Sequence, residues 1–259
     1  DNTAFMKNLA AIETRFGRVA DAAFHVRPGV EVRAKKDLDI ANDLSLHTWR
    51  YDATTGALVT SAADLKNGAN DNGMLEPGFL TLRATGNLAI KNNLSDGFSH
   101  ATPCITVTCS ATTAPATLHG GESWGYRLIA AADTSAIDPL AVEFDKDKDV
   151  TLAASKLVRT GTGDIEIATG GDINLADNKS VIYTAGRAAG SLSGFITPTN
   201  AQFSQGGGDV RLIALGDIVG KPSQQLYSNW LFRQGQLDAS GSKYTTQPAW
   251  WVRFDQFQQ

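Results

Sequence analysis

The apolar and polar positions of the chain repeat one short phrase: a turn residue, an Asp or Asn, and then aliphatic residues at alternate positions. The phrase occurs at residues 36–40, 86–90, 163–167, 171–175 and 208–212, with a shortened copy at 216–218. Alternation with a period of two is typical of a β-strand with one buried face. Because a turn and a short strand recur many times, the pattern predicts one supersecondary unit that is stacked repeatedly.

The spacing of the phrase indicates the kind of stack. Asp164 is followed by Asp172, and Asp209 by Asp217, so the phrase returns after 8 residues. A strand of four or five residues plus a turn fills such a repeat, and three of these sides make one winding of roughly twenty residues. The sequence therefore predicts an all-β parallel β-helix of about eight to ten windings.

The recurrent Gly, Asp and Asn residues favour an architectural role. Glycine tolerates positive φ at a corner, and a short carboxylate or amide accepts hydrogen bonds from turn amides. A row of carboxylates that binds calcium or performs catalysis is the alternative interpretation.

The organisation along the chain predicts three parts. Apolar residues recur three or four apart, which predicts a helix that covers an end or a side of the stack; they are Phe5, Leu9, Ile12, Phe16 and Val19. We expect an N-terminal helix and lead-in at 1–27, the β-helix at 28–226 and an aromatic-rich segment at 227–259. Residues 52–77 and 99–122, rich in small and polar residues, are expected to leave the stack as excursions.

Composition excludes several classes of protein. With 42% hydrophobic and 19% charged residues the chain is an ordinary folded protein, and 25 glycines against 8 prolines favour many turns between short strands. A net charge of -4 with scattered Lys and Arg argues against nucleic acid as a partner. The apolar runs are far shorter than the roughly 20 residues of a membrane-spanning helix, so we expect no membrane span.

Two further features concern the context of the chain. It opens with DNTAFMKNLA, without an initiator Met or a signal-peptide pattern, so we expect a piece excised from a larger protein. Cys104 and Cys109 are its two cysteines. A disulfide that closes a small loop and a pair of free thiols are both compatible with this spacing.

Aromatic residues gather near the end of the chain. Three of the five tryptophans, Trp230, Trp250 and Trp251, lie in the last thirty residues, together with Tyr244. Such side chains stack on sugar rings or anchor a protein partner, so these four residues are the candidate partner-binding residues. The alternative is a small hydrophobic annex that these rings seal where the chain leaves the stack.

Catalytic and metal-binding motifs are not evident. The histidines are isolated in sequence, and no HExxH spacing occurs. GSLSG at 190–194 does not place a serine where a nucleophile elbow requires it, and DKDKD at 145–149 lacks the spacing of an EF-hand loop. The sequence therefore predicts no enzyme, no catalytic residue, no cofactor and no metal site.

Several phrases resemble one known family. The phrases PGFLTLRATGNLAIKNNLSDGF, ESWGYRLIAAADTSAIDPLAV, RTGTGDIEIATGGDINLADNKSVIYTAGR and AWWVRFDQFQQ resemble the filamentous haemagglutinin family of large proteobacterial exoproteins. The more specific ones are LSDGF, SVIYTAG and the closing WW segment. The resemblance implies a right-handed parallel β-helix and two-partner secretion through a dedicated outer-membrane transporter. It also implies display at the cell surface as an adhesin, and it implies no active site.

Three functional hypotheses remain. The leading one is a non-catalytic shaft segment of a secreted, extracellular adhesin at the bacterial cell surface. It would present its excursions and its aromatic segment to a glycan or protein receptor on a host cell or a bacterium. The second is a carbohydrate-active β-helix enzyme, a polysaccharide lyase or hydrolase, with paired carboxylates or a calcium-assisted base on its outer face. The third is the stalk of a contact-dependent toxin delivery protein.

Overall fold

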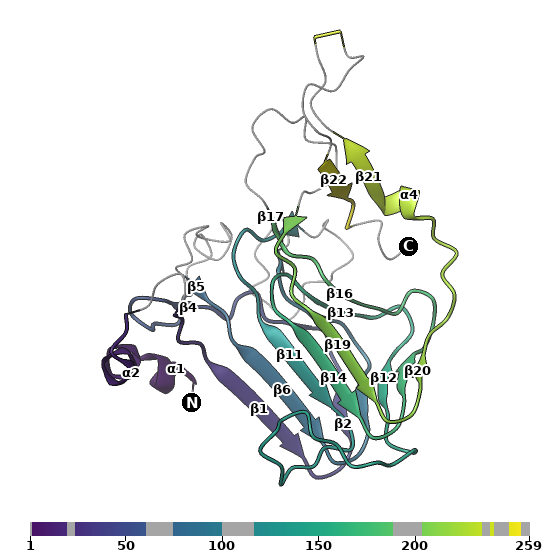
Figure 1. The fold of residues 1–259 in the computed structure, drawn as a ribbon, viewed down its shortest axis with the longest axis horizontal. Helices are drawn as coiled ribbons and strands as arrows, with labels where there is room; N and C mark the ends of the chain where they lie inside the picture. The colour runs from purple at the N-terminus through teal and green to yellow at the C-terminus, as the bar shows by residue number, and fades with distance from the viewer. Residues whose placement is uncertain are drawn as a thin grey trace.

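Three parallel sheets contain most of the strands in the computed structural model of the protein (Figure 1). The structure describes residues 2–19, 24–60, 75–99, 117–188, 204–234, 239–240 and 249–254. The first sheet has the order β1 (Gly29–Ala34), β6 (Phe79–Ala84), β11 (Gly125–Ile129), β14 (Ile165–Thr169), β19 (Val210–Ala214). The second has the order β2 (Leu38–Ile40), β7 (Leu88–Ile90), β12 (Val150–Leu152), β15 (Ile173–Leu175), β20 (Ile218–Val219). The third contains β3 (Leu44–Ser45), β8 (Leu94–Ser95), β13 (Leu157–Thr160) and β16 (Val181–Thr184).

Each pass of the chain, here called a winding, supplies one strand to each sheet. The first winding is β1, β2 and β3, and the fifth ends after β19 and β20. Strands pair in parallel with their counterparts in the next winding, so that Ile165 lies between Tyr126 and Val210. This confirms an all-β protein with stacked parallel sheets. The described residues form five windings, fewer than the expected eight to ten, because the three excursions and the segment between β11 and β12 take up residues without adding strands to these sheets.

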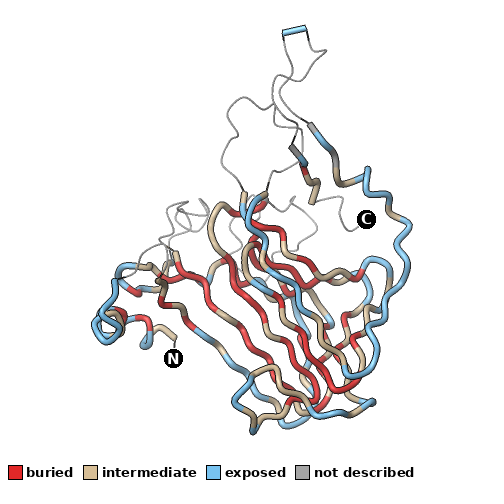
Figure 2. Tube along the Cα trace, in the orientation of Figure 1, coloured by how far each residue is buried: buried red, intermediate tan, exposed pale blue. Residues whose placement is uncertain are grey.

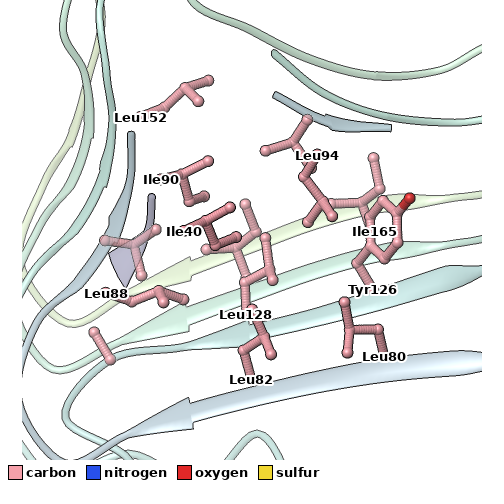
Figure 3. Close-up of a cluster of buried hydrophobic side chains, with 14 of the residues drawn as sticks. Ile40, Leu80, Leu82, Leu88, Ile90, Leu94, Tyr126, Leu128, Leu152 and Ile165 are labelled. Atoms are coloured by element: carbon pink, nitrogen blue, oxygen red, sulfur yellow. The ribbon is translucent and has the colours of Figure 1, made fainter. Parts of the chain in front are cut away.

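The core lies between the three sheets. Aliphatic side chains from each sheet meet there, among them Leu128 of β11, Leu88 of β7 and Leu94 of β8 (Figure 3). All three are fully buried, and the buried stretches follow the middle of the sheets (Figure 2). Burial of apolar surface is the main favourable term in folding, so the alternating aliphatic residues of the repeated phrase are what hold successive windings together.

A row of acidic and amide side chains connects the windings at the corner between the first and second sheets. The Oδ1 atom of each member accepts a hydrogen bond from the backbone N–H of the next. The bonds run from Asn87 to Asp37 (2.8 Å), Asp149 to Asn87 (2.8 Å), Asp172 to Asp149 (2.8 Å) and Asp217 to Asp172 (2.7 Å). We call this row the corner ladder. It confirms the architectural role that the recurrent Asp and Asn residues suggested.

Glycine is required beside the ladder because two windings approach closely there. A Cβ atom at Gly216 would lie 2.2 Å from Oδ1 of Asp172, and one at Gly171 would lie 2.5 Å from Oδ1 of Asp149. Both distances are too short for a side chain. The repeated Gly-Asp pair therefore supplies the acceptor in one winding and the space for it in the next.

The N-terminal region differs from the single helix expected over residues 3–19. It forms two short helices, α1 (Asn2–Met6) and α2 (Leu9–Phe16). The Asn8 side chain donates to the Ala4 carbonyl (2.9 Å) at the break, and such local bonds compete with helix continuation. Met6 and Leu9 are buried against Tyr51 of β4 (Tyr51–Asp52), whereas Val19 is exposed. The helical segment therefore packs on the first excursion.

The expected excursions leave and return as antiparallel strand pairs. β4 pairs with β5 (Leu75–Glu76), and β9 (Phe98–Ser99) pairs with β10 (Thr117–Leu118). Residues 61–74 and 100–116, including Cys104 and Cys109, lie outside the described residues. A further pair, β17 (Arg187–Ala188) with β18 (Ser204–Gln205), marks a third departure. All three follow a strand of the third sheet and precede one of the first, so they share one corner, here called the excursion corner.

Removing a ladder acceptor is expected to destabilise the stack. Asp149→Ala leaves the N–H of Asp172 without its acceptor and also removes a bond from Asn174 (3.2 Å). We expect the free energy of unfolding in urea to fall by about 1–3 kcal/mol. Asp149→Asn keeps an acceptor oxygen and should lose less. Asp147→Ala, at an exposed side chain in the same segment, should stay within about 0.5 kcal/mol of wild type. Equal losses in all three would contradict the role of the ladder.

Candidate functional site: an aromatic hairpin beside the excursion corner

The predicted partner-binding residues belong to a small unit that follows the last winding. It consists of α4 (Tyr227–Trp230), β21 (Leu231–Gln234) and β22 (Ala249–Val252). The two strands are antiparallel, with Arg233 opposite Trp250 and Phe232 opposite Trp251. In Figure 1 the unit stands apart from the three parallel sheets. Because neighbouring residues in a strand point to opposite faces, the two adjacent tryptophans have opposite surroundings.

The structure separates the four predicted residues. Trp250 is 53% exposed, and the guanidinium of Arg233 lies 5.8 Å from its ring centroid. Trp251 is only 4% exposed, so its ring packs within the protein. Trp230 is half-buried at the end of α4, and its carbonyl accepts the N–H of Arg253 (2.7 Å). Tyr244 lies outside the described residues.

Among the described members of the set, Trp250 is therefore the one whose side chain is most exposed. An exposed indole beside an arginine presents an apolar face and a cation together, a combination that suits a sugar ring or an aromatic side chain. Tyr227, which begins α4, is also exposed and contributes a second aromatic ring to this unit. We call Arg233 and Trp250, which contact each other, the aromatic surface.

A cluster of rings, here called the aromatic anchor, fixes the end of this unit on the stack. The ring of Phe254 lies 5.3 Å from that of Phe98 in an edge-on arrangement, and it stacks on Tyr183 at 6.4 Å. Arg159 lies 3.9 Å over the Phe98 ring and donates to the Tyr183 hydroxyl (3.3 Å). The aromatic anchor therefore holds the segment that follows the hairpin against the third sheet and the excursion corner.

The most specific phrases of the sequence meet at this anchor. Phe98 belongs to LSDGF, Tyr183 to SVIYTAG, and Phe254 follows the WW segment. Each phrase is recognisable in the sequence, but nothing in the sequence indicates that the three converge, because they are far apart along the chain. Phe254 and Trp251 pack inward, as the annex interpretation expects for these rings, while Trp250 stays exposed and its role in partner binding stays a prediction.

A buried ion pair supports the excursion corner from within. The Nη2 atom of Arg50 lies 2.7 Å from Oδ2 of Asp96, and both side chains are buried. The same Asp96 oxygen accepts the backbone N–H of Trp124 (2.7 Å). The Trp124 indole in turn donates to the carbonyl of Trp49 (2.7 Å). These bonds join the ends of the first two excursions to the start of β11.

A second charged network attaches the N-terminal lead-in. His25 Nδ1 lies 2.5 Å from Oε1 of the buried Glu76, and Arg27 donates to Oε2 of the same carboxylate (3.0 Å). Arg27 also bonds Glu122. The network bridges three segments that are distant in sequence, so its groups are engaged in holding the fold.

The histidines offer little chemistry. His47 and His119 come within 6.3 Å of each other at the excursion corner, while His100 lies outside the described residues. Burial lowers the pKa of His119 to about 4, which keeps the ring neutral near pH 7. Within the described parts of the chain, no group of three or more His, Cys, Asp or Glu side chains could hold a metal ion. The carboxylates of the corner ladder face backbone N–H groups, an arrangement that serves folding.

Removal of the buried Asp96 carboxylate should lower the stability of the fold. Asp96→Ala leaves Arg50 as a buried charge without its partner and also removes the acceptor of the Trp124 N–H. We expect a loss of about 3–5 kcal/mol in the free energy of unfolding, measured in urea. Asp138→Ala, at an exposed loop residue, is the matched control. A loss below about 1 kcal/mol for Asp96→Ala would show that the ion pair does not stabilise the corner.

The pKa of His119 predicts a pH-dependent stability. Between its ordinary value of 6.5 and about 4, the unfolded chain binds a proton that the folded protein does not. Stability from this residue is therefore present above pH 6.5 and is lost as the pH falls toward 4, by up to about 3 kcal/mol. His119→Phe removes the titrating group, so its urea midpoint should vary less over this range. An unchanged pH profile would contradict the assignment.

Comparison with known proteins identifies no relative. The chain matches no protein-family model, no curated protein and no solved structure. No helix among the described residues has the length and apolar character needed to cross a membrane. The resemblance to the filamentous haemagglutinin family therefore stays a prediction.

Proposed function

We propose that the chain is a non-catalytic shaft segment of a secreted adhesin of the filamentous haemagglutinin type, displayed at the bacterial cell surface. In this proposal the stacked windings form a right-handed parallel β-helix. The complete protein would reach the surface through an outer-membrane transporter partner. The aromatic surface would contact a glycan or protein receptor on a host cell or another bacterium.

The observation that carries the proposal is the corner ladder. The same hydrogen bond recurs between five consecutive windings at 2.7–2.8 Å. In each case a backbone N–H of one winding donates to a side-chain oxygen of the winding before it. Such a unit extends by repetition and resists bending, since the backbone pairs and the core continue together through each step. These properties suit a spacer that carries a binding surface away from a cell.

The position of the aromatic surface supports the assignment of binding to it. The aromatic anchor holds the chain beside the hairpin, so Trp250 is presented from a supported strand. A preorganised aromatic ring loses little conformational entropy on binding. Trp250 therefore fits the role of an anchor residue for a receptor.

Substitution of Trp250 tests the proposal. Trp250→Ala should weaken binding to host epithelial cells or to an immobilised glycan panel by about tenfold or more, the effect expected for a central aromatic contact. Trp250→Phe should retain part of the affinity. Phe144→Ala removes an exposed ring from the segment between β11 and β12, and it should leave binding unchanged.

Two results would count against the proposal. Equal binding by wild type and Trp250→Ala would remove the aromatic surface from the receptor site. Cleavage of any polysaccharide in a broad panel by the purified chain would favour the carbohydrate-active enzyme. Urea midpoints of all variants should match that of wild type, so that a change in binding is not a change in folding.

A further inference from the structure

The stack of windings has a strand edge at each of its two ends (Figure 1). β1 and β2 form one end, here called the head edge, and β19 and β20 form the other, the tail edge. Within the described ranges, no strand pairs with the outer side of any of these four strands. Unpaired edges of this kind are surfaces on which another strand can add.

Parts of the core are uncovered at both edges, although Ile40 of β2 is buried. At the tail edge, Ile218 is 54% exposed, whereas its aligned neighbour Ile173 in the previous winding is 1% exposed. At the head edge, Val32 is 41% exposed, and its aligned neighbour Leu82 is 6% exposed. These residues continue core rows of the stack, so another winding placed on either edge would bury them as it does inside the stack.

The hydrogen-bonding groups of the two edges are complementary. Each ladder residue accepts a bond from the N–H of the next, but the Asp217 carboxylate has no hydrogen-bond partner among the described residues. Asp37 begins the ladder, and within the described part of the chain its backbone N–H makes no bond to a side-chain oxygen of the kind that the other members make. The tail edge thus ends on an acceptor, and the head edge begins with the matching donor.

Charged side chains at the two edges also complement each other when the strands of the first sheet are continued in the same register. The aligned row across the first sheet is Glu31, Thr81, Arg127, Glu166 and Arg211. Inside the stack, Arg127 pairs with Glu166 at 2.7 Å. Arg211 is exposed at the tail edge, and continuation of the row would bring it beside Glu31 of a second copy.

We propose that the tail edge docks on the head edge of a second copy of this chain, with β19 beside β1 and β20 beside β2. In this arrangement the Asp217 carboxylate accepts the N–H of the second copy's Asp37, and Ile218 covers Leu38. The contact joins two different surfaces, so it repeats and produces open chains of molecules.

Two features of the head edge bear on this contact. The residue before each ladder residue is a glycine in three windings, Gly86, Gly171 and Gly216, but it is Lys36 at the head edge. Lys148 stands at the same position inside the stack, where the ladder bond still forms, so a lysine there is compatible with the ladder. The N-terminal helices pack on Tyr51 and leave Glu31 and Val32 exposed. The middle of β1 is therefore accessible to a partner strand.

Sedimentation velocity over a range of protein concentrations tests the contact. The weight-average sedimentation coefficient of wild type should rise with concentration. Ile218→Lys places a charge at the tail edge, and Val32→Lys places one at the head edge, so each variant alone should stay monomeric. An equimolar mixture of the two should stop at dimers, because each molecule then has one intact edge. Ile137→Lys, at a fully exposed residue between β11 and β12, should associate as wild type does.

A charge exchange tests the register. Arg211→Glu should raise the apparent dissociation constant about tenfold or more, and Arg211→Glu combined with Glu31→Lys should recover part of the loss. Because Glu31 also binds Arg33 and Arg83, urea midpoints must show that the double variant is folded.

Three outcomes would overturn the proposal. A wild type that remains monomeric at all concentrations would show that the edges do not associate. Dimers of Val32→Lys alone would indicate a tail-to-tail contact. Association of Ile218→Lys equal to that of wild type would place the contact elsewhere. Self-association is measured without a receptor, so these outcomes are independent of those that test the adhesin.

Discussion

The hydrogen bonds that give corner amides an acceptor in the neighbouring winding are the interaction on which this structure depends. Three strands per winding need sharp turns, and each turn leaves a backbone N–H directed at the neighbouring winding, where an unsatisfied group would cost stability. The corner ladder meets this requirement with one side-chain oxygen per winding, for example Asp149 for the N–H of Asp172. Glycine at Gly171 leaves room for that oxygen, so hydrogen bonding and close packing of the core depend on the same pair of residues.

The residues proposed to bind a receptor lie where this regular pattern is interrupted. The three excursions leave at one corner, and there the fold relies on side chains instead of repeated backbone pairs. The Arg50–Asp96 pair joins the first two excursions beneath the surface, and the rings of Phe98, Tyr183 and Phe254 hold the C-terminal segment against the same corner. The regular stack therefore provides rigidity, and the corner provides a supported place from which Trp250 is exposed.

The strands of the stack were predictable from sequence, whereas the break in the N-terminal helix and the number of windings were not, for physical reasons. Alternating aliphatics after each Gly-Asp phrase identified strands such as β14 and β15 because period-two alternation is local. The single N-terminal helix was wrong, since the Asn8 side chain bonds the backbone at the break and the apolar spacing does not record this. The described residues contain fewer windings than expected because a repeat length read from neighbouring phrases does not show how many residues leave the stack between windings, as they do after β17.

The sequence by itself determined the repeating unit: which residues alternate, where the chain turns, and that Asp or Asn must stand at the corners, since strand periodicity and turn chemistry act over a few neighbouring residues. The tertiary structure alone decided which distant residues meet. It placed Asp96 against Arg50 and Phe254 against Phe98, and it buried Trp251 while exposing Trp250. These outcomes depend on how separate windings are stacked and on where the excursions return, and no local pattern encodes such contacts.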